Sequence, residues 1–150
     1  MTTTRWDYRF LAMAEMISTW SKDPSTKCGA VIIDTQKRII SMGFNGFPAG
    51  TDDSEELYYD RERKYRRVLH AEKNALLFAR QNLTGYTIYV WPMPSCSQCA
   101  AAIIQSGICR VVTIVPNREP EGRWSDDIVE TRQMFSEAGV VLNQYKEIKR

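Results

Sequence analysis

The chain has 150 residues, a length typical of one domain with a sizeable core, and we expect residues 1–150 to form a single domain. With 43% hydrophobic and 25% charged residues, its composition excludes a disordered chain. Its formal net charge of +2 is too small to indicate a nucleic-acid-binding or membrane-surface protein. His70 is the only histidine beside four cysteines, so a transition metal would have to be held largely through sulfur.

The first part of the chain predicts one helix and one hairpin. Apolar residues recur at steps of four and three: Trp6, Phe10, Met13, Ile17 and Trp20. This spacing predicts a helix with one buried face that ends before Pro24. The apolar runs 30–34 and 38–42 flank a short polar turn and predict an antiparallel hairpin. Residues 43–67 are glycine-rich and then strongly charged, and we expect a loop with a short helix there.

The second half alternates between helices and apolar strands. We expect a helix from near His70, a strand at 87–90, a helix at 99–106, a strand at 111–115, a helix at 126–138 and a strand at 140–142. Such alternation is typical of parallel strands covered on both faces. The sequence therefore predicts an α/β fold, a three-layer α/β/α sandwich around a mixed five-stranded sheet. Without a secretory signal or an apolar run of about 18 residues, we expect a cytoplasmic protein that does not span a membrane.

Two fragments at predicted helix starts carry candidate metal ligands: His70-Ala71-Glu72 and Cys96-Ser97-Gln98-Cys99. A Cys-x-x-Cys fragment lets two sulfurs reach one ion from a single helical turn, and a helix N-terminus favours the thiolate form. One histidine and two thiolates make a three-ligand zinc site, which keeps a fourth position open as catalytic sites do.

Glu72 is the candidate catalytic residue, because a carboxylate beside such a site can move a proton from water to a substrate nitrogen. Two helical steps rotate a side chain by about 200°, so Glu72 and His70 converge only if His70 stands at the frayed first position. Each fragment alone has a plainer interpretation. The Cys-x-x-Cys fragment could be a redox pair or two buried cysteines, and the His-x-Glu fragment could be a solvated helix start. Their conjunction at helix starts beside one sheet favours catalytic zinc. Cys28 and Cys109 are predicted to be buried small residues.

The fragments follow the signature His-x-Glu with Pro-Cys-x-x-Cys except at its proline, and the chain resembles the zinc-dependent cytidine deaminase superfamily, within it the deoxycytidylate (dCMP) deaminases. The resemblance also covers the segments 21–27, 29–32, 43–46, 70–75 and 104–108. It implies a cytidine deaminase-like fold, one catalytic Zn²⁺ held by His70, Cys96 and Cys99, and hydrolysis of dCMP to dUMP and ammonia, which would supply dUMP for thymidylate synthesis. Glu72 would protonate N3 of cytosine and then the leaving amine.

The resemblance also implies residues that bind the substrate and partners that regulate it. Asn45 lies close to the nucleotide in the family, and the Asp-Pro-Ser-x-Lys segment near the phosphate makes Ser25, Lys27 and Lys22 candidates. A solvated loop charge is the plainer interpretation of each lysine. Family members are homo-oligomers, often hexamers, and many are activated by dCTP and inhibited by dTTP through the Gly-Phe-Asn-Gly loop.

The chain departs from the family at Ser95, where a proline usually precedes the first cysteine. With no second histidine, we do not expect the second zinc site that some members carry. We interpret the basic segment 60–67 as a solvated helix face, with phosphate or a neighbouring subunit as alternative contacts. Three other functions stay open: deamination of another cytosine nucleotide, nucleoside or base, deamination of an adenosine in tRNA, which needs a more basic surface, and a non-catalytic zinc module, which would have a fourth protein ligand.

Overall fold

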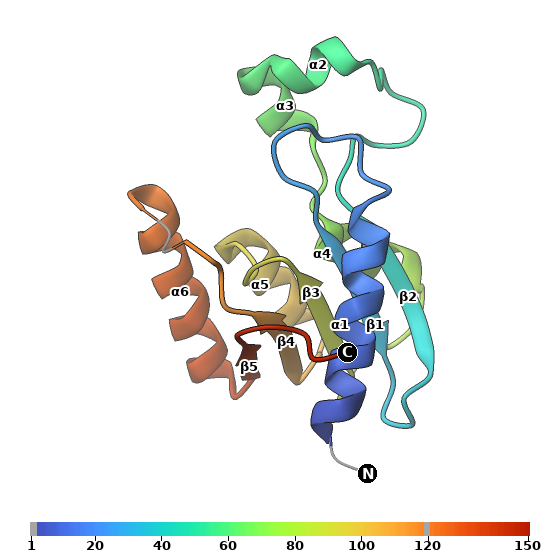
Figure 1. Ribbon diagram of the computed structural model, residues 1–150, viewed down its shortest axis with the longest axis vertical. Helices are drawn as coiled ribbons and strands as arrows, with labels where there is room; N and C mark the ends of the chain where they lie inside the picture. The colour runs from blue at the N-terminus through green and yellow to red at the C-terminus, as the bar shows by residue number, and fades with distance from the viewer. Residues whose placement is uncertain (1–2, 119–120) are drawn as a thin grey trace.

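The computed structural model describes residues 3–118 and 121–150, which form a five-stranded sheet with helices on both faces (Figure 1). The strands are β1 (Gly29–Ile33), β2 (Ile39–Phe44), β3 (Thr87–Trp91), β4 (Arg110–Ile114) and β5 (Val141–Tyr145). The helices are α1 (Thr3–Ser18), α2 (Glu55–Tyr59), α3 (Arg61–Arg67), α4 (Ala71–Ala79), α5 (Ser97–Gln105) and α6 (Arg123–Ala138). The predicted α/β fold around a mixed five-stranded sheet is confirmed.

The order of the strands places the starts of three helices at one edge of the sheet. The order is β2-β1-β3-β4-β5, in which β1 is antiparallel to both of its neighbours and β3, β4 and β5 are parallel. Strand β2 therefore runs in the same direction as β3. Because α4, α5 and α6 each follow one of these co-directional strands, their N-termini lie at the carboxyl edge, where open α/β sheets bind ligands.

Each face of the sheet has its own hydrophobic core. On one face α1 packs through Phe10, Leu11 and Ile17 against strand residues that include Val31 and Val112. On the other face α4, α5 and α6 cover a core that combines small and large side chains, among them Ala71, Ala75, Ala100, Ile103 and Phe135. Figure 1 shows α1 alone in front of the sheet, with these three helices on the other side. This is the three-layer arrangement that the alternating pattern predicts.

Helix α4 lies very close to the sheet because β2 has a glycine beneath it. A Cβ atom added at Gly43 would lie 2.5 Å from the carbonyl oxygen of Ala71 and 2.6 Å from the backbone nitrogen of Ala75. The Ser41 hydroxyl, two residues earlier in β2, donates a 2.7 Å hydrogen bond to the Ala75 carbonyl. The first turn of α4 is therefore held against backbone, which fixes where the helix begins.

Three sequence expectations are wrong in detail. Helix α1 ends at Ser18, so Trp20 lies outside the buried stripe, 55% exposed and edge-on to Phe44. Cys109, the residue before β4, is exposed, and Cys28 is only half-buried. Residues 43–67 carry two short helices, where one was expected. Within the described part of the chain, no helix combines the length and the apolar character that crossing a bilayer requires.

Candidate active site

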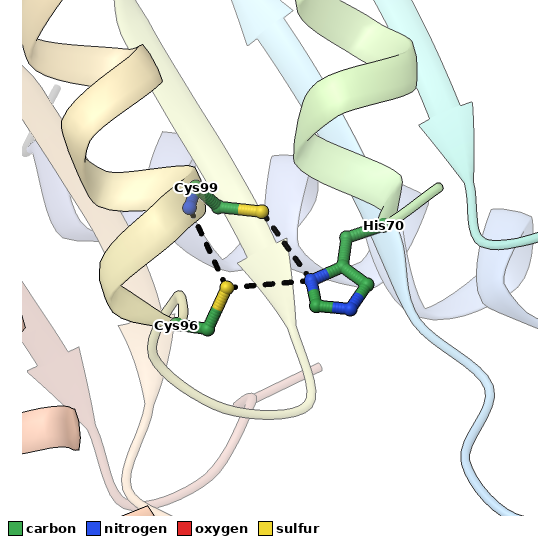
Figure 2. Close-up of side chains that lie close together, drawn as sticks. All are labelled: His70, Cys96 and Cys99. Atoms are coloured by element: carbon green, nitrogen blue, oxygen red, sulfur yellow. Dashed lines mark hydrogen bonds between the residues drawn. The ribbon is translucent and has the colours of Figure 1, made fainter. Parts of the chain in front are cut away.

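The three predicted metal ligands converge at the carboxyl edge of the sheet. His70 and Cys96 are the N-cap residues of α4 and α5, both with extended backbone, and Cys99 lies in the first turn of α5. Figure 2 shows the His70 imidazole facing both sulfurs. Its Nδ1 atom lies 3.4 Å from the Sγ atom of Cys96 and 3.4 Å from that of Cys99. The three donor atoms all lie within 4.8 Å of one another.

These separations suit a tetrahedral zinc ion. With Zn–S bonds of about 2.3 Å and a Zn–N bond of about 2.0–2.1 Å, tetrahedral angles separate sulfur from nitrogen by about 3.6 Å. The observed 3.4 Å contacts need only a small expansion to hold the ion. Among the described residues no fourth His, Cys, Asp or Glu joins the group. Three protein ligands and one free position define a site for metal-assisted hydrolysis.

The electrostatics of the three side chains favour proton loss at Cys96. Its pKa is lowered, chiefly because the Cys99 thiol shares a proton with its sulfur, and His70 and the Cys99 backbone N–H add to the effect. The same pairing and burial raise the pKa of Cys99. The hydrogen bond with Cys96 raises the pKa of His70. Zinc would replace these shared protons, since it binds thiolates and neutral imidazole.

Glu72 is the second residue of α4 and lines the same cavity as His70 and Cys96. Because His70 stands outside the helix as its N-cap, the two side chains can reach one space although they are two residues apart. Glu72 is 5% exposed, and burial raises the pKa of its carboxyl group. A buried carboxyl whose pKa is shifted towards neutrality is suited to accept and return a proton.

The cavity above these residues has a volume of about 520 Å³. Its walls come from residues 23–28, from α3, from the segment after β3 and from the segment that leads into α6. Trp91, Met93 and Pro94 supply an apolar wall beside the metal ligands, suited to the faces of a flat ring. Ser95 is buried, and its carbonyl accepts a 3.0 Å hydrogen bond from Thr131, so α6 fixes the loop before Cys96.

Of the predicted substrate-binding residues, Ser25 and Asn45 line the cavity. The Asn45 side chain also holds the wall together: its Oδ1 accepts from the Cys28 backbone N–H at 2.8 Å, and its Nδ2 donates to the Thr26 carbonyl at 2.9 Å. The two predicted lysines lie elsewhere. Lys22 forms a 2.5 Å ion pair with Asp53, and Lys27 donates to the Ser21 carbonyl.

The basic segment 60–67 contributes cavity residues that the sequence did not reveal. Interpreting it as a solvated helix face is wrong for Lys64, whose side chain is buried and forms a 2.8 Å ion pair with Asp23. Arg61 and Tyr65 of the same helix also line the cavity, as do Arg118 and Trp124 from the opposite half of the sequence. The sequence does contain one signal for this burial, which is the high density of Lys and Arg residues just before His70. Such like charges repel one another, so at least one of them is expected to pair with a carboxylate.

Comparison with known proteins agrees with this site. Residues 4–115 match the family model described as the cytidine and deoxycytidylate deaminase zinc-binding region. The "uncharacterized deaminase in luxG 3′ region" of Aliivibrio fischeri is 47% identical over 91% of each chain. Human deoxycytidylate deaminase is 33% identical over 147 residues, covering 93% of this chain and 79% of the human protein.

The fold agrees as well. The crystal structure of dCMP deaminase from cyanophage S-TIM5 in apo form matches with a TM-score of 0.73 over 96% of this chain and 99% of that chain, at 22% identity. The family match and the three-ligand site thus define a zinc-dependent hydrolytic deaminase. The chain belongs to the cytidine and deoxycytidylate deaminase family.

Proposed function

We propose that this protein hydrolyses dCMP to dUMP and ammonia. The observation that carries the proposal is the convergence of His70, Cys96 and Cys99 on one point, with Glu72 buried in the same cavity. Deoxycytidylate deaminases from human and mouse are each 33% identical over 93% of the chain, which supports the choice of a nucleotide. Among the residues that the structure describes, the group has three ligands and no fourth, which supports turnover over a structural zinc module.

The chain's own residues would divide the reaction between them. When bound, zinc lowers the pKa of water in its open position to about 7, which makes hydroxide available at neutral pH. His70, Cys96 and Cys99 would hold the ion, and His70 and Cys96 line the cavity. Glu72 accepts one proton of the attacking water and delivers it to N3 of cytosine. It then takes the second proton from the new hydroxyl group on C4 and passes it to the amino group, which leaves as ammonia while C4 becomes a carbonyl. The raised pKa of Glu72 suits both directions of transfer.

Asn45 binds the nucleotide sugar in this proposal. Its Oδ1 has two lone pairs, of which the Cys28 backbone N–H occupies one. The second lone pair can accept a hydrogen bond from the 3′-hydroxyl of the deoxyribose. Because the Asn45 amide is fixed by Cys28 and Thr26, that acceptor is preorganised, and no side-chain freedom is lost when the substrate binds.

A panel of substrates tests the proposal. Purified zinc-loaded protein is mixed with dCMP, deoxycytidine, cytosine, CMP and an adenosine-containing tRNA anticodon stem, and ammonia release is measured. We expect the highest kcat/KM for dCMP. Faster turnover of deoxycytidine than of dCMP would contradict a nucleotide substrate, and turnover of the tRNA alone would favour the adenosine alternative. Zinc content near one ion per chain without any turnover would indicate a binding module.

The protein also forms a homo-oligomer under dCTP and dTTP control in this proposal. A second cavity of about 370 Å³ lies beside Gly43 and Gly46, and several large apolar side chains around it are exposed: Trp20, Met42, Phe44, Leu77 and Phe78. Exposed apolar patches of this kind mark interfaces between proteins. Light scattering after size-exclusion chromatography should give a multiple of 17.3 kDa, a hexamer by family resemblance. We place the protein in the cytoplasm, since its four cysteines are free.

A further inference from the structure

Helix α6 contacts the chain on both sides of the metal ligand Cys96. The Thr131 hydroxyl donates a 3.0 Å hydrogen bond to the carbonyl oxygen of Ser95, the residue before Cys96. The Asp127 carboxylate accepts two hydrogen bonds from Ser97, the residue after Cys96. The Ser97 backbone N–H donates to Oδ2 at 2.9 Å, and its hydroxyl donates to Oδ1 at 2.5 Å. Because Asp127 and Thr131 are four residues apart, they are neighbours on one face of α6.

The contact with Asp127 completes the start of α5. Ser97 is the first residue of that helix, and its N–H group is one of the four that have no acceptor within a helix. The N-cap side chain of Cys96 accepts from the Cys99 backbone N–H at 3.4 Å, so it serves a different donor. The acceptor for Ser97 therefore comes from α6, 30 residues later. A carboxylate is well suited to this end of the helix, where the helix dipole is positive.

The contact with Thr131 restrains the other side of Cys96. A proline before Cys96 would fix its own φ angle through its ring, but Ser95 has no such restraint. Ser95 and Thr131 are both buried, so loss of the Thr131 hydroxyl would remove a donor from a carbonyl group in the interior. The same end of α6 carries Trp124 and Ile128, which line the catalytic cavity. One helix thus forms part of the cavity wall and also holds the chain around a metal ligand.

We propose that Asp127 and Thr131 are positioning residues of the zinc site. They hold the backbone before and after Cys96, so that its sulfur stays directed at the point where the three ligands converge. The inference rests on the zinc site of the proposed function and not on the choice of substrate. Without these two contacts Cys96 would have more backbone freedom, and zinc would leave the protein faster.

Release of zinc tests the proposal without any substrate. Zinc-loaded wild type, Asp127→Ala and Thr131→Val are mixed with excess 4-(2-pyridylazo)resorcinol, at a temperature at which circular dichroism shows each protein to be folded. The absorbance of the zinc–chelator complex gives the rate constant of release. Loss of a group that orients a metal ligand typically changes metal affinity by about 10- to 100-fold, so we expect release to accelerate by about that factor.

Three further variants distinguish positioning from a general loss of stability. Asp126→Ala is the matched control, because it removes the same charge one residue earlier in α6 from an exposed side chain. It should release zinc at the wild-type rate. Thr131→Ser keeps the hydroxyl and should release zinc nearly as slowly as wild type. Asp127→Asn keeps the shape and one acceptor oxygen, so its rate should lie between those of wild type and Asp127→Ala, and it replaces Asp127→Ala if that variant does not fold.

Replacement of zinc by Co²⁺ provides a second measurement. Thiolates bound to Co²⁺ give a charge-transfer band in the near ultraviolet, whose intensity follows the number of bound sulfurs. The band should weaken in Asp127→Ala and stay unchanged in Asp126→Ala. Wild-type release rates in both Asp127→Ala and Thr131→Val, or equally fast release from Asp126→Ala, would overturn the positioning role. Wild-type protein that retains zinc but does not turn over dCMP would instead refute the proposed substrate, so the two failures can be told apart.

Discussion

Asp7 in α1 and Arg110 in β4 form a two-pronged ion pair, with Nη1 3.0 Å from Oδ1 and Nη2 2.5 Å from Oδ2. The Asp7 side chain is fully buried and also accepts hydrogen bonds from the hydroxyl groups of Tyr89, at 2.7 Å, and Tyr145, at 2.6 Å. One carboxylate therefore joins α1 to three strands of the sheet. Its removal would leave three donors without this acceptor: the buried Tyr89 hydroxyl group and the half-buried Arg110 and Tyr145 side chains.

We expect Asp7→Ala to lower the free energy of unfolding by about 3–5 kcal/mol, the usual cost of breaking a buried ion pair from one side. Urea unfolding measures the change. Glu15→Gln is the control, since it removes an ion pair with Arg150 at the surface, where pairs contribute about 0–1 kcal/mol. Equal losses in the two variants would show that the Asp7 network does not stabilise the fold.

Removal of the metal should affect stability as well as activity. The ligands come from the starts of two helices that are 26 residues apart in sequence, so zinc crosslinks α4 to α5. A ligand present at 1,000 times its Kd stabilises a protein by about 4 kcal/mol. Chelation should therefore abolish turnover and lower the unfolding temperature, and zinc should restore both.

The cysteine variants provide the control for that experiment. Cys99→Ser should lose most of the bound zinc, because a buried ligand is removed. Cys109→Ser should retain it, because that thiol is exposed and does not belong to the group of three donors. Zinc content is measured by atomic emission on purified protein. Similar zinc loss in both variants would contradict the assigned ligand set.

Glu72→Gln separates proton transfer from metal binding. We expect kcat to fall by about 10²- to 10⁴-fold, the usual contribution of a positioned acid–base group, while zinc content stays unchanged. Retained turnover would contradict the role of Glu72 as the group that moves protons.

The same variant makes a prediction about pH in metal-free protein. Burial raises the folded-state pKa of Glu72 above 4.5, so the folded state binds this proton more tightly than the unfolded state does. Wild-type stability should then fall as the pH rises from about 4.5 towards the folded pKa. Glu72→Gln removes this loss, so it should unfold at a higher temperature than wild type at pH 8 and at a similar temperature at pH 4. The reverse order would show that the buried carboxylate is favourably paired.

Cys28 should be the slowest of the free thiols outside the metal site to react. Burial, together with the charges of Glu72 and Asp23, raises its pKa to about 12. At pH 8 it would hold about a thousandfold less thiolate than an ordinary cysteine with a pKa of about 8.5. Treatment of zinc-loaded protein with iodoacetamide, followed by peptide mass spectrometry, should label Cys109 first. Equal rates at Cys28 and Cys109 would refute the predicted shift.

The sequence predicts the order of the elements because their apolar residues follow helix or strand periods. It also predicts the clustering of the ligands, since helices that follow co-directional strands all begin at one edge. The limits of single elements are less exact: α6 begins at Arg123, three residues before the predicted start. The first turn of α6 has few apolar residues, so no hydrophobic periodicity indicates where the helix begins.

The parts that the sequence did not reveal depend on partners far apart in the chain. Burial of Lys64 requires Asp23, which is 41 residues away, and no local pattern distinguishes this lysine from its solvated neighbours Arg63 and Arg66. Trp20 satisfies the spacing of α1, but hydrogen bonds at the end of the helix stop it at Ser18. Periodicity identifies faces of elements, whereas ion pairs and exact ends depend on tertiary contacts.

Gly43 affects the active site because it has no Cβ atom. Any side chain at this position would push the backbone of Ala71 away from the sheet, and Ala71 lies between His70 and Glu72. In a survey of all single substitutions, Gly43 should therefore tolerate as little change as the ligands do, although it is not among the residues that line the catalytic cavity. Substitutions are thus restricted at a residue that takes no part in the reaction. The reason is that the missing side chain of Gly43 lets α4 approach the sheet, which sets the distance between the sheet and the His70 imidazole.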